Sequence, residues 1–391
     1  MNGKMEWLFW QLIYFFIKQR YRIVQLSHRV NEIWLESLEN RRVPLVRIVR
    51  DDIDWGQQLK RDMEYAWRVV GQLPRRKIGK ADQVVNIYIS TYPPVDDWEF
   101  LIAKPLPLPQ RRNGVFRTLL IHSGNIEHSL QQLTDTIKTP IVLSPISDDS
   151  DPFFEAERLK HRIFQEVREQ QERERRLFEY GKPVFTYIFI VLQVALFLLM
   201  EWSGGSTNPE VLIRYGAKFN PLIWEGEWWR FFTPIFLHIG FLHLLMNTFA
   251  LYYLGMMVER LYGSWRFFCI YMIAGFFGTL GSFLFTSSLS AGASGAIFGL
   301  FGALLYFGTV YRHLFFQTIG TNIISLIIIN LLFGIVVPGI DNAGHIGGLI
   351  GGFLAAGIVH LPNHVAWKRQ ARSLFVTVSI AALGLLIGFR L

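Results

Sequence analysis

The second half of the chain consists largely of long apolar runs, which predict membrane-spanning helices. A helix needs about 20 apolar residues to cross the hydrocarbon core of a bilayer, and seven runs after residue 183 approach that length. They are Val184–Met200, Ile235–Val258, Trp265–Ser287, Ala293–Tyr311, Leu314–Val337, Ala343–Leu361 and Leu374–Phe389. The pattern therefore predicts a polytopic α-helical membrane domain over residues 181–391, with seven spans.

In the first 180 residues, short apolar runs alternate with more polar segments, which is typical of a soluble domain. Short β-branched runs predict strands, and segments with helical periodicity separate them. The predicted strands are Val43–Val49, Val84–Ile89, Val115–Ile121 and Pro140–Leu143, and the predicted helices are Trp55–Val70 and Ile126–Ile137. The apolar segment Trp7–Ile17 is too short to span a bilayer and predicts a helix packed on this domain, with attachment to the membrane surface as the alternative. We therefore expect a mixed α/β domain over residues 1–180.

A charged segment, Asp151–Tyr180, connects the two predicted domains. Its Glu and Arg residues recur at close spacing, which favours a solvated helix with intrahelical ion pairs. An acidic cluster of Asp148, Asp149 and Asp151 lies at its start. Capping of the helix N-terminus accounts for this cluster, and a divalent-metal site is the alternative.

Composition separates the same two parts and excludes several classes of protein. Residues 1–180 carry 28 Lys and Arg and 25 Asp and Glu, whereas residues 181–391 carry only 11 and 6. These figures exclude a wholly soluble domain and a wholly disordered chain. The first part has a small net charge and no nucleic-acid-binding motif, so we expect no nucleic-acid partner. The single cysteine, Cys269, excludes an intrachain disulfide and a thiolate zinc cluster, and we expect no cofactor or metal.

Basic residues between the spans predict the orientation of the membrane domain. Alternate short connections carry Arg260, Arg266, Arg312, Lys368, Arg369 and Arg372, and an Arg-rich stretch precedes the first span. The opposite side has Arg214, Lys218 and Arg230 in one long loop, and Arg390 at the end. Because cytoplasmic loops are enriched in Lys and Arg, the N-terminal domain is predicted in the cytoplasm and the C-terminus outside the cell membrane.

Four polar side chains inside apolar runs indicate a functional site. They are His243 and Asn247 in the second run, Ser294 in the fourth and His345 in the sixth. Polar groups in a membrane are costly and therefore mark catalytic or binding sites. Under the predicted orientation, all four lie near the outer ends of their helices.

Glycine surrounds Ser294 and His345. The serine follows Gly292 and Ala293 and precedes Gly295, at a predicted helix start where free N–H groups favour a developing oxyanion. Two stripes of small residues follow, one of Gly295, Gly299 and Ala303 and one of Gly344, Gly348 and Gly352. Small residues at every fourth position let helices approach closely in lipid. This approach would bring Ser294 within hydrogen-bond reach of His345.

In this order and spacing, the motifs of the second half resemble the rhomboid family of intramembrane serine proteases. The matching residues are Trp229, Arg230, His238, His243, Asn247, Gly255, Glu259, Gly263, Gly292, Ser294, Gly295, His345, Gly348 and Gly352. The resemblance covers residues 184–361. Residues 1–180 and the seventh span resemble bacterial members that have a cytoplasmic domain and a six-plus-one arrangement of spans.

The resemblance implies a function and a role for each site residue. Ser294 and His345 would form a catalytic dyad, and His243, Asn247 and the Ser294 backbone N–H would bind the oxyanion. The substrates would be transmembrane segments of single-span or polytopic membrane proteins, cleaved near the outer membrane face. Asp341, four residues before His345, is the one carboxylate that could orient the imidazole, and a dyad without it is favoured.

Two other functions remain open on the residues alone. Buried His and Asn could bind a substrate or ion in a transporter, or the chain could be a non-proteolytic scaffold for transmembrane helices. A zinc protease is disfavoured because no His-Glu-x-x-His motif occurs, and a paired-aspartate mechanism lacks its second acid. Residues 1–180 could bind a ligand or a protein partner of their own.

Overall fold

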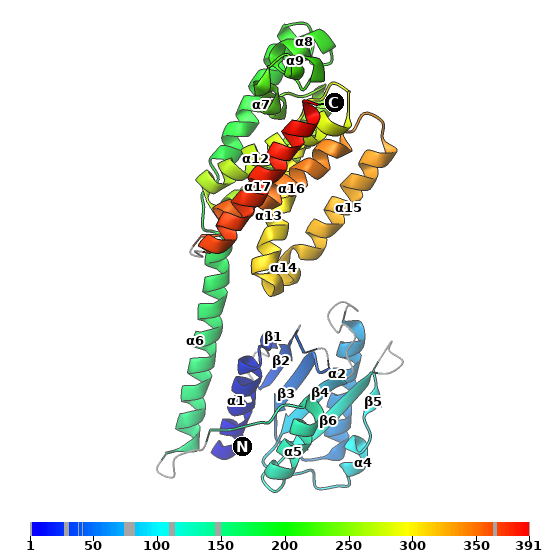
Figure 1. Ribbon diagram of the computed structural model, residues 1–391. Coiled ribbons are helices and arrows are strands. Elements are labelled where there is room, and N and C mark those ends of the chain that lie inside the picture. The colour runs from blue at the N-terminus through cyan, green and yellow to red at the C-terminus, as the bar shows by residue number, and fades with distance from the viewer. Residues whose placement is uncertain are drawn as a thin grey trace. The chain divides into compact units, whose positions relative to one another are not determined.

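The structure is a computed structural model that describes residues 2–26, 31–37, 39–40, 42–73, 83–108, 114–144, 150–362 and 366–390. The chain divides into two compact units, Met1–Gln171 and Glu172–Leu391. Figure 1 labels the helices and strands of both units, and each unit is described by itself.

Within its described residues, the first unit is built on a six-stranded mixed sheet. The strands are β1 (Arg22–Leu26), β2 (Glu32–Glu36), β3 (Leu45–Arg50), β4 (Gln83–Ile89), β5 (Leu106–Pro107) and β6 (Val115–Ile121), in the order β1-β2-β3-β4-β6-β5. Strands β1, β2 and β3 form an antiparallel meander, and β3, β4 and β6 are parallel. Parallel neighbours need crossover connections, and α2 (Gly56–Gln72) supplies the one between β3 and β4.

Helices cover both faces of this sheet. Side chains of α1 (Gly3–Lys18), α5 (Ile126–Ile137) and the first part of α6 (Pro152–Phe178) pack on one face, and α2 and α4 (Glu99–Ile102) pack on the other. Successive residues of a strand point to opposite faces, so buried Val84 and Val85 contribute to different clusters. The apolar segment Trp7–Ile17 lies in α1 against the sheet, as predicted.

Most elements predicted in the first unit are present, with one exception. Strands β3, β4 and β6 and helices α2, α5 and α6 match their predicted ranges to within a few residues. The predicted strand Pro140–Leu143 is wrong: this segment forms no strand, and its apolar residues Ile141 and Leu143 pack against the core on one face of the sheet instead of pairing within it. Strands β1 and β2 were not predicted, since charged and polar residues interrupt their apolar positions.

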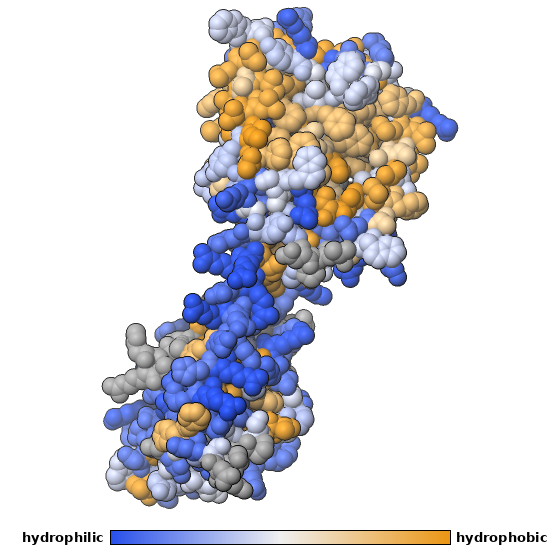
Figure 2. Space-filling model, turned by 90° about the vertical axis from the view of Figure 1, so that its left-hand side faces the viewer, coloured by the Kyte–Doolittle hydropathy of each residue, from blue (hydrophilic) through white to orange (hydrophobic). Residues whose placement is uncertain are grey.

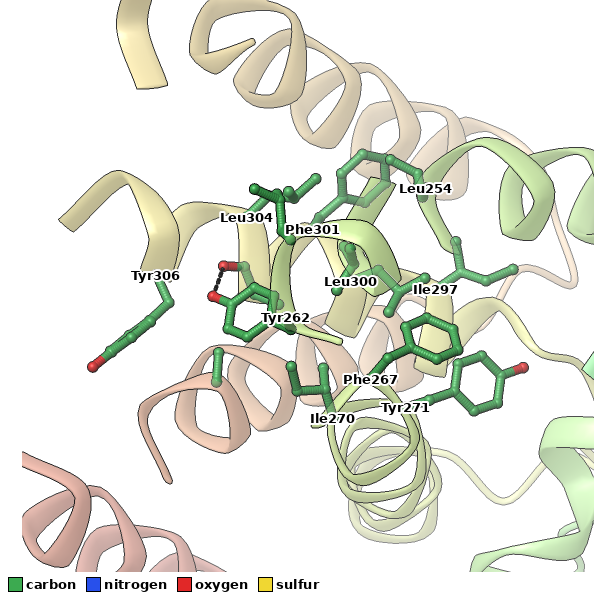
Figure 3. Close-up of a cluster of buried hydrophobic side chains, with 14 of the residues drawn as sticks. Leu254, Tyr262, Phe267, Ile270, Tyr271, Ile297, Leu300, Phe301, Leu304 and Tyr306 are labelled. Atoms are coloured by element: carbon green, nitrogen blue, oxygen red, sulfur yellow. Dashed lines mark hydrogen bonds between the residues drawn. The ribbon is translucent and has the colours of Figure 1, made fainter. Parts of the chain in front are cut away.

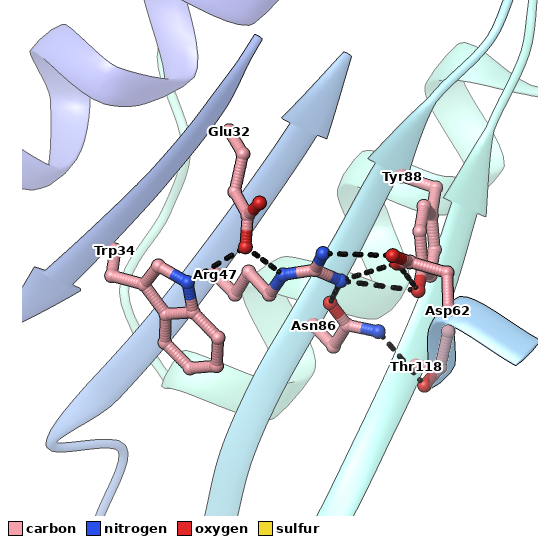
Figure 4. A network of polar contacts seen from close by, with 7 residues as sticks. All are labelled: Glu32, Trp34, Arg47, Asp62, Asn86, Tyr88 and Thr118. Atoms are coloured by element: carbon pink, nitrogen blue, oxygen red, sulfur yellow. Dashed lines mark hydrogen bonds and ion pairs between the residues drawn. The ribbon is translucent and has the colours of Figure 1, made fainter. Parts of the chain in front are cut away.

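A buried arginine organises the centre of the sheet (Figure 4). Arg47 of β3 is 1% exposed and donates hydrogen bonds to Glu32 at 2.8 Å, Asp62 at 2.6 Å, Asn86 at 3.1 Å and Tyr88 at 3.2 Å. Burial raises the pKa of the Tyr88 phenol, which stays protonated and donates to Asp62 at 2.5 Å. A buried charge is tolerated only when it is paired and fully hydrogen-bonded, so this network ties α2 to three strands.

The charged segment before the membrane unit is a single helix, α6, as predicted. Ion pairs at three- and four-residue spacing line it, including Arg162 with Glu166 and Arg175 with Glu179. Asp151 accepts a hydrogen bond from the Phe153 N–H at 2.9 Å, which satisfies one amide of the first turn. Asp148 and Asp149 lie outside the described residues, and the described residues contain no group of three or more metal-binding side chains.

The second unit is a bundle of apolar helices. They are α7 (Phe185–Trp202), α10 (Phe241–Ala250) continued by a π-helical turn η3 (Leu251–Gly255) and α11 (Met256–Tyr262), α12 (Ser264–Phe285), α13 (Ser294–Val310), α14 (Arg312–Thr318), α15 (Gly320–Val336), α16 (Asn342–Val359) and α17 (Trp367–Gly388). Short helices α8 (Pro209–Tyr215), α9 (Asn220–Trp224), η1 (Trp228–Phe231) and η2 (Thr233–Phe236) form the long connection between α7 and α10.

Each of the seven predicted spans falls on helix, but the lengths differ from expectation. Among the described residues, five helices are long and apolar enough to cross a membrane: α7, the continuous Phe241–Tyr262, α12, α16 and α17. The fifth predicted span is a bent pair, α14 and α15, with an angle of 71° between them. The fourth, α13, has only 17 residues. Most of α13 is buried among other helices, so its length need not match the lipid.

The core of this unit lies around α13 (Figure 3). Buried side chains of α13, such as Ile297, Leu300 and Leu304, pack against buried residues of η3, α11 and α12. Tyr262 donates its hydroxyl to the Ala303 carbonyl at 2.8 Å, which satisfies the polar group inside the cluster. Apolar side chains also cover most of the visible outer face of the unit (Figure 2). Such a surface requires a lipid environment.

Candidate active site

Ser294 and His345 lie at the starts of two adjacent helices. Ser294 is the first residue of α13, and His345 lies in the first turn of α16. Oγ of Ser294 and Nε2 of His345 are 3.0 Å apart, which is hydrogen-bond distance. A hydroxyl beside an imidazole can lose its proton to that base as it attacks an electrophile, so the pair can perform nucleophilic catalysis.

Glycine allows the two helices to approach this closely. A Cβ atom at Gly348 would overlap the carbonyl oxygen of Gly295, and one at Gly352 would overlap the carbonyl oxygen of Gly299. Any larger residue would therefore push α13 and α16 apart. The two stripes of small residues seen in the sequence form this contact.

The His345 ring is held by packing. It stacks on Phe298 with 4.2 Å between ring centroids and 8° between planes, and it is 8% exposed. Its Nδ1 atom has no hydrogen-bond partner among the residues that the structure describes. Stacking restricts rotation of the ring and leaves Nε2 directed at Ser294.

Asp341 does not orient the imidazole. Its Oδ1 accepts a hydrogen bond from the Gly344 N–H at 2.9 Å, which makes it the N-cap of α16. Its Oδ2 accepts a hydrogen bond from the Ser290 hydroxyl at 2.9 Å. Both carboxylate oxygens thus contact groups other than the ring, and Ser294 and His345 form a hydrogen-bonded pair with no carboxylate on the imidazole among the described residues.

His243 lies beside the segment that leads into Ser294. A Cβ at Gly292 would come within 2.9 Å of His243 Nε2, so only glycine leaves room for the imidazole here. Asn247, one turn later on α10, is 6% exposed and donates from Nδ2 to the His243 carbonyl at 2.9 Å. The structure therefore places His243 next to the segment that leads into Ser294. Asn247 is buried one turn further along α10.

His238 supports the same segment from the loop before α10. The Ala293 N–H points to His238 Nε2 at 3.5 Å, and the His238 ring packs edge-on against that of His243, with 5.4 Å between centroids. His238 is fully buried. It therefore fixes the residue that precedes the serine.

Glu259 caps the first helix of the unit. Its carboxylate accepts hydrogen bonds from the N–H groups of Val184, Phe185 and Thr186 at 2.7 to 2.9 Å, and from the Thr186 hydroxyl at 2.7 Å. Glu259 is fully buried, so these four donors compensate for the loss of water around its charge. This residue is structural and joins α11 to the start of α7.

Arg230 organises the long connection between α7 and α10. Its guanidinium donates to the carbonyls of Ile213 and Ala217 at 2.9 and 2.8 Å and pairs with Glu227. Trp229, the neighbouring residue, is exposed. Arg230 therefore holds the loop together, while Trp229 presents an aromatic ring at its surface, a position that suits a membrane interface.

Two residues close to the site were not singled out in the sequence. Phe298 follows Ser294 by four positions, so helical spacing could have identified it as facing the same side of α13. Ser290 contacts Asp341 although 51 residues separate them, and nothing in the sequence indicates this pairing.

Comparison with known proteins relates the chain to one protein family. Residues 225–362 match the family model of the rhomboid domain. Rhomboid protease GluP of Bacillus subtilis is 41% identical over 384 residues, which cover 96% of this chain and 73% of that protein. The putative rhomboid protease YdcA of Bacillus subtilis is 38% identical over 44% of this chain and 86% of its own length. RHOMBOID-like protein 4 of Arabidopsis thaliana is 38% identical over 40% of each chain.

The fold and these similarities define a multi-pass membrane protein with an N-terminal α/β unit. The chain belongs to the rhomboid family. Its similarity to one rhomboid protease over nearly its whole length supports intramembrane protease activity, so the chain is classed as a hydrolase.

Proposed function

We propose that this chain is a serine protease that cleaves transmembrane segments near the outer face of the cell membrane. The observation that carries the proposal is the 3.0 Å contact between Ser294 Oγ and His345 Nε2 at two helix starts. Ser294 attacks the scissile carbonyl and His345 takes its proton. His345 then returns the proton to the leaving amine, and water hydrolyses the acyl-enzyme.

The developing oxyanion has suitable donors nearby. The Ser294 backbone N–H lies at the start of α13, where amide groups have no intrahelical acceptor. The His243 side chain lies against Gly292, and Asn247 follows one turn later on α10, where its amide donates to the His243 carbonyl. Donors held in place before the reaction stabilise the transition state without reorganisation.

Cleavage of defined membrane substrates tests this function. The full-length protein in liposomes is incubated with a panel of single-span proteins, each paired with a variant in which Gly or Pro near the outer end of its helix is replaced by Leu. We expect the Gly- or Pro-containing form to be cleaved faster, because a scissile carbonyl must first leave its helical hydrogen bond. Ser294→Ala is the negative control, and faster cleavage of the Leu forms would show that unwinding is not limiting.

The proposed orientation has its N-terminal unit in the cytoplasm and its C-terminus outside. Two sets of contacts support alternating helix directions. Trp224 Nε1 donates to the Gly388 carbonyl at 2.9 Å, which joins the end of α17 to the loop after α7. At the opposite end, Arg266 Nε donates to the Val359 carbonyl at 3.3 Å, beside the basic residues expected on the cytoplasmic side.

Reporter fusions test this orientation. We expect an enzyme that is active only outside the cytoplasm to give a signal when fused after Leu391 and none when fused at the N-terminus. A fluorescent protein that matures only in the cytoplasm should give the reverse result. A C-terminal reporter active only in the cytoplasm would contradict the orientation and the outer position of Ser294.

We further infer that substrates enter beside α15. Only Gly320, Ile323, Ile327 and Gly334 of its 17 residues are buried, whereas bulky residues such as Leu332 and Phe333 are exposed. Helix α13, in contrast, is buried along most of its length. A loosely packed helix can move aside at lower cost than one held by glycine contacts.

A crosslink between α10 and α15 tests this entry route. In a Cys269→Ser background, one cysteine is placed on each helix and the two are joined by a bifunctional reagent. We expect crosslinked protein to lose cleavage of membrane substrates while Ser294 keeps its reactivity toward a small fluorophosphonate. A crosslink between α12 and α17 is the control, and unchanged cleavage after verified α10–α15 crosslinking would contradict the route.

A further inference from the structure

A single side-chain hydrogen bond joins the segments that lead into Ser294 and His345. The Ser290 hydroxyl donates to Asp341 Oδ2 at 2.9 Å. Ser290 lies four residues before Ser294, and Asp341 lies four residues before His345. Neither side chain takes part in the reaction proposed above, so the contact between them requires a separate explanation.

Asp341 is connected rigidly to the turn that carries His345. Its Oδ1 accepts from the Gly344 N–H at 2.9 Å, and its backbone carbonyl accepts from the His345 N–H at 3.1 Å. A displacement of Asp341 would therefore displace the first turn of α16, including the imidazole.

Ser290 is held equally firmly from the other side by Lys218. The two backbones pair in both directions, with N···O distances of 2.9 and 3.1 Å. The fully buried Lys218 side chain donates from Nζ to the carbonyls of Thr286 and Ser288 at 2.7 and 3.1 Å. Burial lowers the pKa of Lys218 to about 8, so at neutral pH most molecules keep the ammonium group and its three donors. The loop before Ser294 is thus anchored at several points.

We propose that Ser290 and Asp341 are positioning residues, whose hydrogen bond sets the separation between the starts of α13 and α16. Through that separation it sets the distance from Ser294 Oγ to His345 Nε2, while Lys218 keeps Ser290 in place. Small errors in the placement of reacting groups cost rate rather than substrate binding. This hydrogen bond, called the Ser290–Asp341 bridge below, therefore affects kcat. The inference rests on the proposed serine protease function.

Variants of the bridge, made in the full-length protein in liposomes, test the proposal. They are Ser290→Ala, Asp341→Ala, the double variant, Asp341→Asn and the control Ser288→Ala. The Ser288 side chain lies in the same loop and is exposed. Two quantities are measured: kcat and KM for one cleaved membrane substrate, and the rate at which a fluorophosphonate labels Ser294. Retention of the folded state is checked for each variant by thermal unfolding in detergent.

We expect Ser290→Ala and Asp341→Ala each to lower kcat and the labelling rate by about tenfold, the effect of losing one hydrogen bond to a charged group. KM should remain unchanged. The double variant should lose no more than Asp341→Ala alone, because Ser290→Ala removes a hydrogen bond that Asp341→Ala has already removed together with the α16 cap. Asp341→Asn should retain most activity, since its amide can accept from the Gly344 N–H and donate to Ser290, and Asn caps a helix as well as Asp does.

Each other outcome overturns the proposal in a recognisable way. Full activity of Ser290→Ala, or a loss of about a hundredfold in the double variant, would show that the two residues do not act through their hydrogen bond. A loss in Asp341→Asn as large as in Asp341→Ala would assign a direct role to the carboxylate charge. If Asp341→Ala does not fold, Ser290→Ala and Asp341→Asn still decide the question. A wild-type protein that neither cleaves nor labels at Ser294 would instead refute the proposed function.

Discussion

Ser294→Ala is expected to reduce cleavage of a membrane substrate to the uncatalysed background. The substitution removes the hydroxyl that lies 3.0 Å from His345 Nε2, and no other group at this position can form the acyl-enzyme. His345→Ala should be similarly severe, because the hydroxyl then lacks a base at hydrogen-bond distance. The measurement is turnover of one membrane substrate in liposomes by each variant, after its folding has been verified.

Substitutions at the other residues of the site should reduce kcat by smaller amounts, in a defined order. His243→Ala and Asn247→Ala each remove one proposed oxyanion donor, which typically costs about 10²–10³ in kcat. Asp341→Ala should be milder, at about tenfold, because the carboxylate caps α16 and does not contact the imidazole. Robust cleavage by Ser294→Ala would refute the serine mechanism, and a loss in Asp341→Ala equal to that in His345→Ala would replace the dyad by a triad.

Gly348→Ala is also expected to have a large effect, although it adds only one methyl group. A Cβ at this position would overlap the backbone carbonyl oxygen of Gly295, so α13 and α16 must separate. Overpacking of this kind costs about 1–3 kcal/mol of stability. A shift of about 1 Å between Ser294 and His345 can lower the rate by a further 10²-fold. Thermal unfolding in detergent and kcat for one membrane substrate measure the two effects.

Gly384→Ala is the matched control for this prediction. It also adds a methyl group to a buried glycine of a membrane helix, α17. The three atoms nearest to the added Cβ all belong to the Leu280 side chain, with Cδ2 at 3.0 Å, and a side chain needs to shift by only a few tenths of an ångström to relieve this contact, whereas at Gly348 the backbone itself must move. Little change in stability or kcat is expected. Equal effects of the two substitutions would show that the α13–α16 contact is not specially sensitive.

The polar residues of the site could be found in the sequence because polar residues are rare in segments that span lipid. His243, Ser294 and His345 interrupt runs of apolar residues, and glycine at four-residue spacing marks the helices that must approach each other. Ser290 could not be assigned, because a serine in a loop carries no local signal, and helical spacing places Phe298 on the face of Ser294 without indicating what its ring contacts. Their contacts with His345 and Asp341 exist only in the folded chain.

The fold was predictable to a similar degree, for similar reasons. Strands β3, β4 and β6 are buried on both faces and read as continuous β-branched runs, whereas β1 and β2 lie toward one edge and contain charged residues. The bend between α14 and α15 and the shortness of α13 also escaped prediction. Hydropathy measures how apolar a segment is. It does not indicate where contacts with other helices terminate a helix or bend it.

The buried carboxylate of Glu259 has a consequence for how the protein is made. The amides of Val184, Phe185 and Thr186 depend on an acceptor that is synthesised more than 70 residues later. At about 5–20 residues per second, several seconds pass before that acceptor leaves the ribosome. During this interval water at the membrane interface must bind these amides. The first membrane helix therefore reaches its final state only after the second has been inserted, so the two enter the folded structure as a pair.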